Sequence, residues 1–144
     1  MPSSTSQDQR HLKRIKLVQH LFAHTFDQDH FSEGKLPFEQ ALQPEIDCLL
    51  ENLEKIDAQL CQHAPERPLS EINQVDLAIL RVIVWEWMTK KTPYKVLIDE
   101  AVELAKELGS DSSPRFINGV LGKLLVEDEK LSQKPEKLET TALD

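Results

Sequence analysis

Long apolar runs, glycine and strand-like patterns are all scarce in this sequence. Only four of its 144 residues are glycine, and no apolar run approaches the roughly 18 residues that a membrane-spanning helix needs. Residues 1–11 are polar and lack the apolar core of a secretory signal peptide. We therefore expect a cytoplasmic protein that does not associate with a membrane.

Metal sites and disulfides have little support. The two cysteines, Cys48 and Cys61, are separated by 13 positions, and only His63 stands close to one of them. A structural zinc site needs four such ligands, usually as two closely spaced pairs. We expect two ordinary thiols, no metal and no cofactor.

Catalytic motifs are absent as well. The sequence has no glycine-rich phosphate loop, no HExxH motif and no serine–histidine or histidine–cysteine constellation. Asp99, Glu100 and Glu103 are close together, but they alternate with Lys95 and Lys106. That alternation is typical of an exposed helix with intrahelical ion pairs. The sequence therefore indicates a protein that is not an enzyme.

Charge is distributed unevenly along the chain. The net charge is −8, yet residues 1–26 alone carry +3 and the remainder −11. Electrostatic attraction is screened over about 8 Å at physiological salt, so a basic patch can attract phosphate even on an acidic protein. The residues of that patch are Arg10, Lys13, Arg14 and Lys16.

Hydrophobic spacing predicts an all-α fold, a single-domain bundle of about six to seven helices. The segments expected to be helical are 8–26, a short piece from Pro37, 44–63, a turn at 69–72, 75–88, 93–108 and a last helix after Ser113. The segment 75–88 is apolar nearly all round, which predicts a central position. Residues 1–7 and 127–144 are polar and expected to be disordered, which leaves 8–126 as the helical domain.

Two helix starts and one helix end are well marked. Thr92 and Ser113 each precede a proline, the pattern of a capping residue followed by proline at the first helical position. Gly109 is expected just beyond the end of its helix. In the first helix, the spacing places Leu12, Ile15, Val18, Phe22 and Phe26 on the buried side, with the basic residues opposite. Leu17 and Leu21 fall on that basic side without an evident role.

Three blocks in the second half of the chain carry a family resemblance. The first is Gln74–Arg81 (QVDLAILR) followed by Trp85-Glu86, the second is Pro93–Val96 with Ile98–Lys106, and the third is Phe116–Leu121 (FINGVL). In sequence and in spacing they resemble the NusB family of transcription antitermination factors. In the first half, Val18–Phe22 is similar to the end of the family's arginine-rich first helix, although the basic run is thinner here.

The resemblance implies an RNA-binding adaptor with a NusB-like helical fold. The family binds boxA-type single-stranded RNA in ribosomal and phage leader transcripts, together with the ribosomal protein NusE, in a complex on RNA polymerase. Recognition of single-stranded RNA needs cations for phosphates and aromatic faces for bases. The resemblance assigns RNA contacts to Arg10, Lys13, Arg14, Lys16, Ser112, Arg115 and Phe116.

Several of these assignments have an ordinary structural alternative. The basic residues could form a solvated helix face, Arg115 could be simply exposed, and Phe116 could belong to the core. The family usually has Asp where this chain has Ser112, so either Ser112 strengthens RNA binding or Asp111 replaces the missing Asp.

The resemblance also implies protein contacts. Asp76 and Phe22 match positions at or near the NusE interface, but Asp76 could instead be a charge favoured by the helix N-terminus. Arg81 and Glu86 are expected in buried polar networks, and Asn118 and Gly119 in structural roles. The alternative function is an adaptor that binds only protein, or a homodimer through the first helix, with weak or no RNA affinity. The family domain also occurs fused to RNA methyltransferases, but this chain is expected to hold no catalytic part.

Overall fold

The protein is an arrangement of helices, described here from a computed structural model that covers residues 2–26, 40–63 and 68–126. Within these ranges there are six α-helices, a 3-10 turn and a π-helical segment, and no strand. The elements are α1 (Pro2–Phe26), α3 (Gln43–Glu51), α4 (Leu53–His63), η1 (Leu69–Glu71), α5 (Gln74–Lys90), α6 (Tyr94–Leu108), α7 (Ser113–Leu121) and η2 (Gly122–Val126). The all-α prediction is confirmed.

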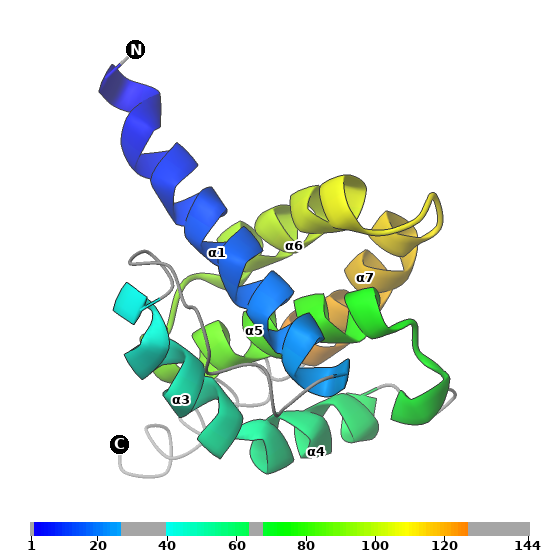
Figure 1. Ribbon diagram of the computed structural model, residues 1–144. Helices are drawn as coiled ribbons and strands as arrows, with labels where there is room; N and C mark the ends of the chain where they lie inside the picture. The colour runs from blue at the N-terminus through cyan, green and yellow to red at the C-terminus, as the bar shows by residue number, and fades with distance from the viewer. Residues whose placement is uncertain (1, 27–39, 64–67, 127–144) are drawn as a thin grey trace, which may run out of the picture.

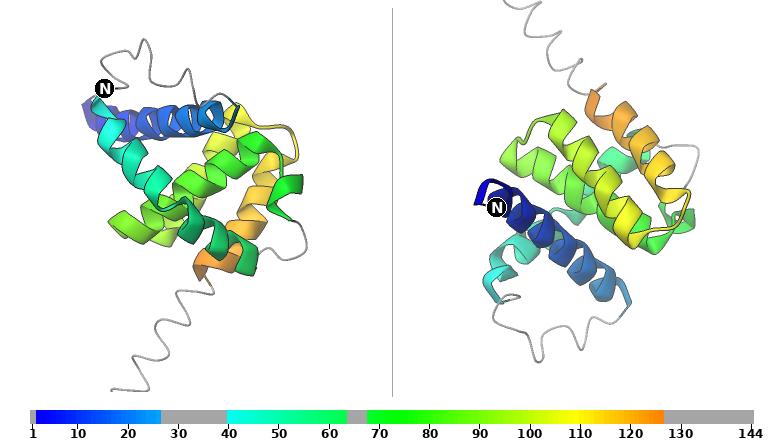
Figure 2. Two further views of the ribbon diagram at one scale, coloured as in Figure 1. Left: turned by 60° about the horizontal axis from the view of Figure 1, so that its bottom comes forward. Right: turned by 90° about the horizontal axis from the view of Figure 1, so that it is seen from above.

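Helix α5 lies at the centre of the bundle, as its apolar composition predicts. It packs against α1, α4, α6 and α7, and the ribbon views show these helices around it (Figures 1 and 2). Every residue from Asp76 to Glu86 except Arg81 is buried. The helix starts at Asn73, whose side-chain oxygen accepts hydrogen bonds from the backbone N–H groups of Val75 and Asp76.

The buried face of α1 differs from the predicted one. Arg14, Leu17, Val18 and Leu21 are buried, whereas Leu12 is 46% exposed. The spacing of these four residues is that of one helix face, but the prediction counted arginine as outward-facing. Arg14 can lie inward because a carboxylate of α5 neutralises it. The same shift explains Leu17 and Leu21, which belong to the core.

The beginning of α1 also differs, since the helix starts at Pro2 and not at Asp8. Proline is well suited to the first turn of a helix because its missing N–H would have no helical partner there. In Figure 1 the first turns of α1 extend beyond the rest of the bundle. The tail at 127–144 lies outside the described residues, as does the beginning of the short helix expected from Pro37. Of that short helix, Gln40 and Ala41 are described, and both are helical.

The helix predicted over 44–63 is two helices, α3 and α4, which meet at Asn52. The amide Nδ2 of Asn52 donates to the carbonyl oxygen of Cys48 at 2.7 Å, and the backbone N–H of Asn52 reaches the same oxygen at 3.2 Å. Asparagine side chains compete in this way with the regular helical ladder. The two helices therefore contact different neighbours, α1 for α3, and α5 and η2 for α4.

The predicted caps of α6 and α7 are each displaced by one residue. Pro93 is the residue before α6, and the hydroxyl of Thr92 donates to Glu86 instead of capping the helix. Ser112 is the residue before α7, and the hydroxyl of Ser113 accepts from the backbone N–H of Ser110. Neither helix has a side-chain cap at its start.

Gly109 ends α6 as predicted, but for a different reason. Its backbone is extended and not left-handed, so the glycine is not needed for a positive φ. A Cβ at this position would lie 2.5 Å from the Ser113 Oγ and 2.9 Å from the carbonyl oxygen of Ala105. The close approach of α7 to the end of α6 is therefore what requires glycine here.

The predicted structural roles of Asn118 and Gly119 are wrong. Both residues are exposed on α7, and a Cβ added to Gly119 would meet nothing within 4 Å. The inward side of α7 is formed by Ile117, Val120 and Leu121. The last helix then continues as the π-helical segment η2, which buries Leu124 and Leu125.

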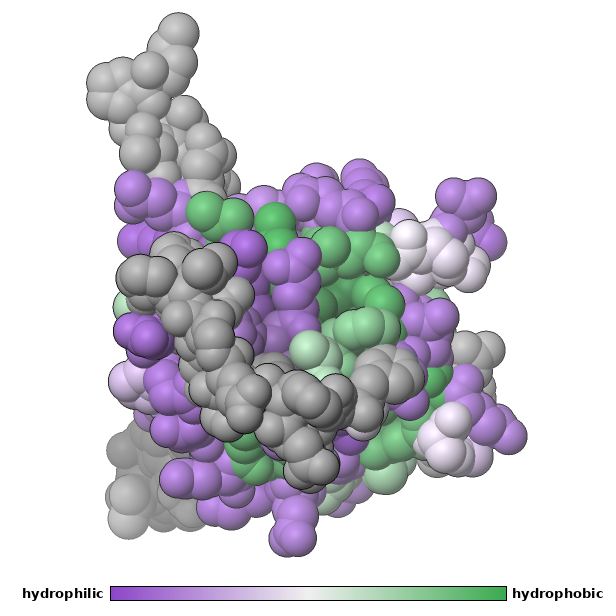
Figure 3. Space-filling view, in the orientation of Figure 1, coloured by the Kyte–Doolittle hydropathy of each residue, from purple (hydrophilic) through white to green (hydrophobic). Residues whose placement is uncertain are grey.

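The face of the molecule drawn in Figure 3 exposes both hydrophilic and hydrophobic residues. In the space-filling view a band of hydrophobic residues lies beside α1 on the side of α6 (Figure 3). Leu12 and Val96 are the large apolar residues that are most exposed, each at 46%. No helix in the described part of the chain is both long and apolar enough to cross a bilayer.

Candidate nucleic-acid interface

The N-terminal basic residues border an open pocket of about 600 Å³ between α1, α3, α5 and α6. Three of the four predicted basic residues, Arg10, Lys13 and Arg14, line it, and α5 contributes Lys90. Three carboxylates face the same space. The lining therefore carries a net charge of +1, in contrast to −8 for the whole chain. The remaining lining residues are Leu17, Glu45, Glu86, Thr92, Val96 and Glu100.

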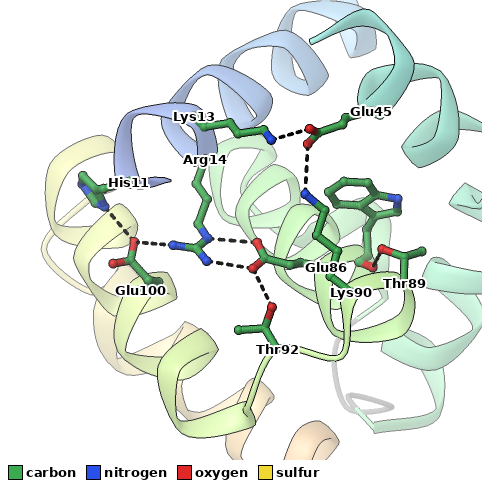
Figure 4. A network of polar contacts seen from close by, with 10 residues as sticks. His11, Lys13, Arg14, Glu45, Glu86, Thr89, Lys90, Thr92 and Glu100 are labelled. Carbon is green, nitrogen blue, oxygen red and sulfur yellow. Dashed lines mark hydrogen bonds and ion pairs between the residues drawn. The ribbon is translucent and has the colours of Figure 1, made fainter. Parts of the chain in front are cut away.

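Arg14 forms the floor of the pocket and is held by two carboxylates. Its Nε and one terminal nitrogen donate to the two oxygens of Glu86 at 2.9 and 2.7 Å, and the other terminal nitrogen lies 3.4 Å from Glu100 (Figure 4). Thr92 donates a further hydrogen bond to Glu86 at 2.9 Å. The two-pronged guanidinium–carboxylate geometry is the strongest form of ion pair. Arg14 therefore ties α1 to α5 and α6.

The charge state of this pair is well defined. Burial alone would raise the pKa of Glu86, but the Arg14 hydrogen bonds and positive charge outweigh it, and the pKa falls below its ordinary value. The hydrogen bonds to Glu86 likewise raise the pKa of Arg14. Both groups are ionised at neutral pH.

Lys13 and Lys90 share a single carboxylate at the mouth of the pocket. Lys13 Nζ pairs with Glu45 Oε1, and Lys90 Nζ lies 3.3 Å from Glu45 Oε2 (Figure 4). Lys90 also lies over the ring of Trp85, with 5.3 Å between Nζ and the ring centroid. Glu45 and Lys90 are not recognisable as site residues from sequence, because their contact with α1 joins segments far apart in the chain.

His11 makes a second link between α1 and α6. Its Nδ1 lies 2.8 Å from Glu100 and its Nε2 lies 2.6 Å from Glu107. The hydrogen bond to Glu100, with the further contribution of Glu107, raises the pKa of His11 in spite of partial burial. Protonated histidine donates from both ring nitrogens, so it fits between two carboxylates.

The other two predicted basic residues of α1 have no ion pair with any described residue. Arg10 is exposed, and Lys16 is half-buried. The four residues are thus not equivalent. Arg10 faces solvent at the pocket, Lys13 and Arg14 are paired within the protein, and Lys16 does not line the pocket.

The predicted residues near the start of α7 form a separate group. Ser112 and Arg115 are exposed, and Phe116 is half-buried against the core. None of the three lines the pocket. The candidate RNA contacts therefore form two groups, one on α1 at or near the pocket and one at the start of α7.

The two residues predicted at a protein interface are both largely covered. Asp76 lies in the first turn of α5, where the helix dipole favours a negative charge, and its Oδ1 is buried without a hydrogen-bond partner among the described residues. Phe22 is half-buried and packs against the core from α1. Arg81 forms the expected polar network with Asp57, with two hydrogen bonds of 2.9 Å.

The cysteines are both free, and within the described residues no three potential metal ligands come together. Cys61 is exposed. Cys48 is half-buried and accepts a hydrogen bond at 3.4 Å from the indole N–H of Trp85. This contact fixes the indole ring over which Lys90 lies.

Comparison with known proteins agrees with this helical arrangement. The model of the NusB family matches residues 11–125. The chain belongs to the NusB family. The transcription antitermination protein NusB of Campylobacter concisus is 37% identical over 124 residues, which are 80% of this chain and 95% of that protein. The protein of the same name from Chloroflexus aggregans is 39% identical over 127 residues, covering 79% and 85% of the two chains.

A solved structure gives the same result for the fold. The NusB of T. maritima superposes with a TM-score of 0.72 at 29% sequence identity, over 85% of this chain and 96% of that one. The NusB fold is therefore confirmed. The matched region contains α1 from His11 onward and all of α5, α6 and α7. It therefore includes every candidate RNA contact except Arg10, which directly precedes it.

Proposed function

We propose that this NusB-family protein acts as a transcription antitermination factor that binds boxA-type single-stranded leader RNA of ribosomal RNA operons. It would do so together with a NusE-type ribosomal protein of the small subunit, in a complex on RNA polymerase. The observation that carries the proposal is the positive pocket beside α1 on an otherwise acidic protein. Phosphate contacts supply most of the affinity for nucleic acid, and they need local positive charge.

The two groups of residues have different proposed roles. At the pocket, Arg10 is exposed and unpaired among the described residues, Lys13 contacts phosphate from the rim and Arg14 mainly holds α1 in place. Lys16 contacts phosphate from α1 outside the pocket. On α7, Arg115 contacts phosphate and Phe116 stacks on a base. Ser112 adds no negative charge there, which favours an RNA backbone close to α7.

The protein partner is proposed to contact α1 and the start of α5. Phe22 offers a partly exposed aromatic side chain, and a donor from the partner would satisfy the unpaired Oδ1 of Asp76. The net negative charge of the protein disfavours RNA binding. RNA should therefore bind more tightly when the NusE-type protein is also bound.

Titration of a labelled boxA-like oligomer with and without the NusE-type protein tests the proposal. We expect weak binding without the partner and clearly tighter binding with it, with a slope of log affinity against log salt of about −0.7 for each phosphate neutralised. No binding under either condition would sink the RNA role.

Two single variants test the α7 group. Arg115→Ala should weaken binding by a similar factor for every RNA sequence, since it removes a phosphate contact. Phe116→Ala should weaken the preferred sequence by about ten- to a hundredfold, the range for loss of one stacked base, and a scrambled oligomer much less. Equal losses on both oligomers for Phe116→Ala would remove the stacking role.

A protein-only adaptor or homodimer is the second candidate function. It is favoured by the internal pairing of Lys13 and Arg14, which reduces the charge available to RNA, and by the exposure of Leu12 and Val96. Sedimentation of the protein alone and with the NusE-type partner, in parallel with the RNA titration, separates the two functions. Complex formation with protein but not with RNA would favour the adaptor.

A further inference from the structure

Glu45 occupies an unusual place among the charges of the pocket. It is the one pocket-lining carboxylate that pairs with lysines, whereas Glu86 and Glu100 are held by Arg14. Its two oxygens each face a different ammonium group, one from α1 and one from α5. Two ammonium groups around one pair of acidic oxygens are also what an RNA phosphate would require.

The three side chains of this arrangement are accessible and able to rearrange. The side chains of Lys13, Glu45 and Lys90 are 37%, 24% and 43% exposed, compared with 10% for Arg14 and 8% for Glu86. Lysine has a flexible stem and a single point charge, so an exposed lysine–glutamate pair contributes little and separates easily. The Arg14–Glu86 pair, in contrast, is buried and bidentate.

The lysines are nevertheless held in position by more than Glu45. Lys90 is the last residue of α5, and the Trp85 ring lies beneath its ammonium group. Lys13 is next to Arg14, which the Glu86 pair fixes in place. If the Glu45 carboxylate moved away, both ammonium groups would still face the pocket.

We propose that the Lys13–Lys90 pair is a phosphate subsite of the RNA interface and that Glu45 is a built-in competitor occupying it in the free protein. RNA binding then exchanges the Glu45 carboxylate for a backbone phosphate, and Glu45 moves into solvent. This inference rests on the proposed RNA-binding function and adds to it a residue that lowers RNA affinity. A phosphate diester competes successfully with Glu45 for the two lysines only when neighbouring contacts hold the RNA in place. The exchange therefore favours RNA that also contacts the rest of the interface.

The test compares two glutamates in matched positions. Glu45 lies in the first turn of α3 and Glu54 in the first turn of α4, so Gln at either position removes the same charge and a similar helix-dipole interaction. No residue of α4 lines the pocket, and Glu54 is exposed. A long-range effect of net charge would therefore be similar in both variants, and a local effect would be confined to Glu45.

Binding of the same boxA-like oligomer is measured for the wild type, Glu45→Gln and Glu54→Gln over a range of salt concentrations. We expect Glu45→Gln to bind about fivefold more tightly at low salt, since two exposed charge pairs are released, with a salt slope that is steeper by up to one unit. Glu54→Gln should differ little from the wild type. Circular dichroism confirms that the variants are folded.

The reciprocal variants test the lysines themselves. Lys13→Gln and Lys90→Gln should each make the salt slope shallower, and each should abolish most of the gain when combined with Glu45→Gln. Equal behaviour of Glu45→Gln and Glu54→Gln, or weaker binding by Glu45→Gln, would overturn the inference while leaving RNA binding intact. Absence of RNA binding in the wild type and all variants would instead overturn the proposed function, and the inference with it.

Discussion

Replacement of Arg14 by alanine separates the structural role of this residue from a role in RNA contact. The substitution removes the two hydrogen bonds to Glu86 and the charge near Glu100. Thr92 would remain as the one described hydrogen-bond donor to Glu86. The Glu86 side chain is only 8% exposed, so solvent cannot readily replace the lost guanidinium.

The expected loss of stability is large. Leaving one partner of a buried ion pair without its counter-charge costs about 3–5 kcal/mol. For a chain of this size, each kcal/mol lowers the melting temperature by about 3 °C, which gives a fall on the order of 10 °C. The double variant Arg14→Met with Glu86→Leu should lose much less, because no buried charge is left unpaired.

Urea unfolding followed by circular dichroism measures these differences for Arg14→Ala, for the single variants Arg14→Met and Glu86→Leu, and for the double variant that combines the last two. The sum of the single losses should exceed the loss in the double variant by about 2 kcal/mol or more, as expected for directly coupled residues. A loss below about 1 kcal/mol for Arg14→Ala, with a marked fall in RNA affinity, would refute this reasoning. Arg14 would then act mainly at the RNA surface.

Two further predictions concern stability. Because the pKa of His11 is raised, its ion pairs stabilise the fold fully below its ordinary pKa of 6.5, and this contribution is lost as pH rises through the raised value. The melting temperature should therefore decline between pH 5.5 and 9, and the decline should be smaller in His11→Gln. Identical melting profiles for the two proteins would contradict this prediction. Gly109→Ala should destabilise by about 1–3 kcal/mol because its Cβ would clash with Ser113 and Ala105. Gly119→Ala is the matched control, and it should stabilise α7 by about 0.5–1 kcal/mol since its surroundings are open. Urea unfolding measures the free energy of unfolding of both variants. Similar changes in the two would contradict the packing argument.

The fold could be predicted from the sequence because its signals are local. The apolar run of α5 and the proline and glycine positions around α6 and α7 predict the ends of these helices to within one or two residues. The turn at Leu69–Glu71 was also predicted from sequence. In these segments the local preferences of the chain and its tertiary packing agree.

The interface was less predictable because its contacts join residues far apart in the chain. Nothing in the residues around Arg14 indicates that Glu86 will neutralise it, 72 positions later, so the orientation of α1 was predicted incorrectly. Thr92 does not cap α6 because its hydroxyl donates to Glu86, the carboxylate that the tertiary contact with Arg14 holds in place. A basic helix in sequence is therefore a poor guide to which of its cations are available to a ligand.

The break at Asn52 links the architecture of the bundle to the electrostatics of its surface. An uninterrupted helix over this region would have carried Glu45 along the axis of α4, away from the direction in which α3 runs toward α1. The hydrogen bond from the Asn52 amide to Cys48 therefore influences how far the Glu45 carboxylate reaches, although Asn52 itself touches no charge of the pocket. A substitution that straightened this junction would move the Glu45 carboxylate away from the two lysines. Its effect on the pocket would resemble the loss of one negative charge.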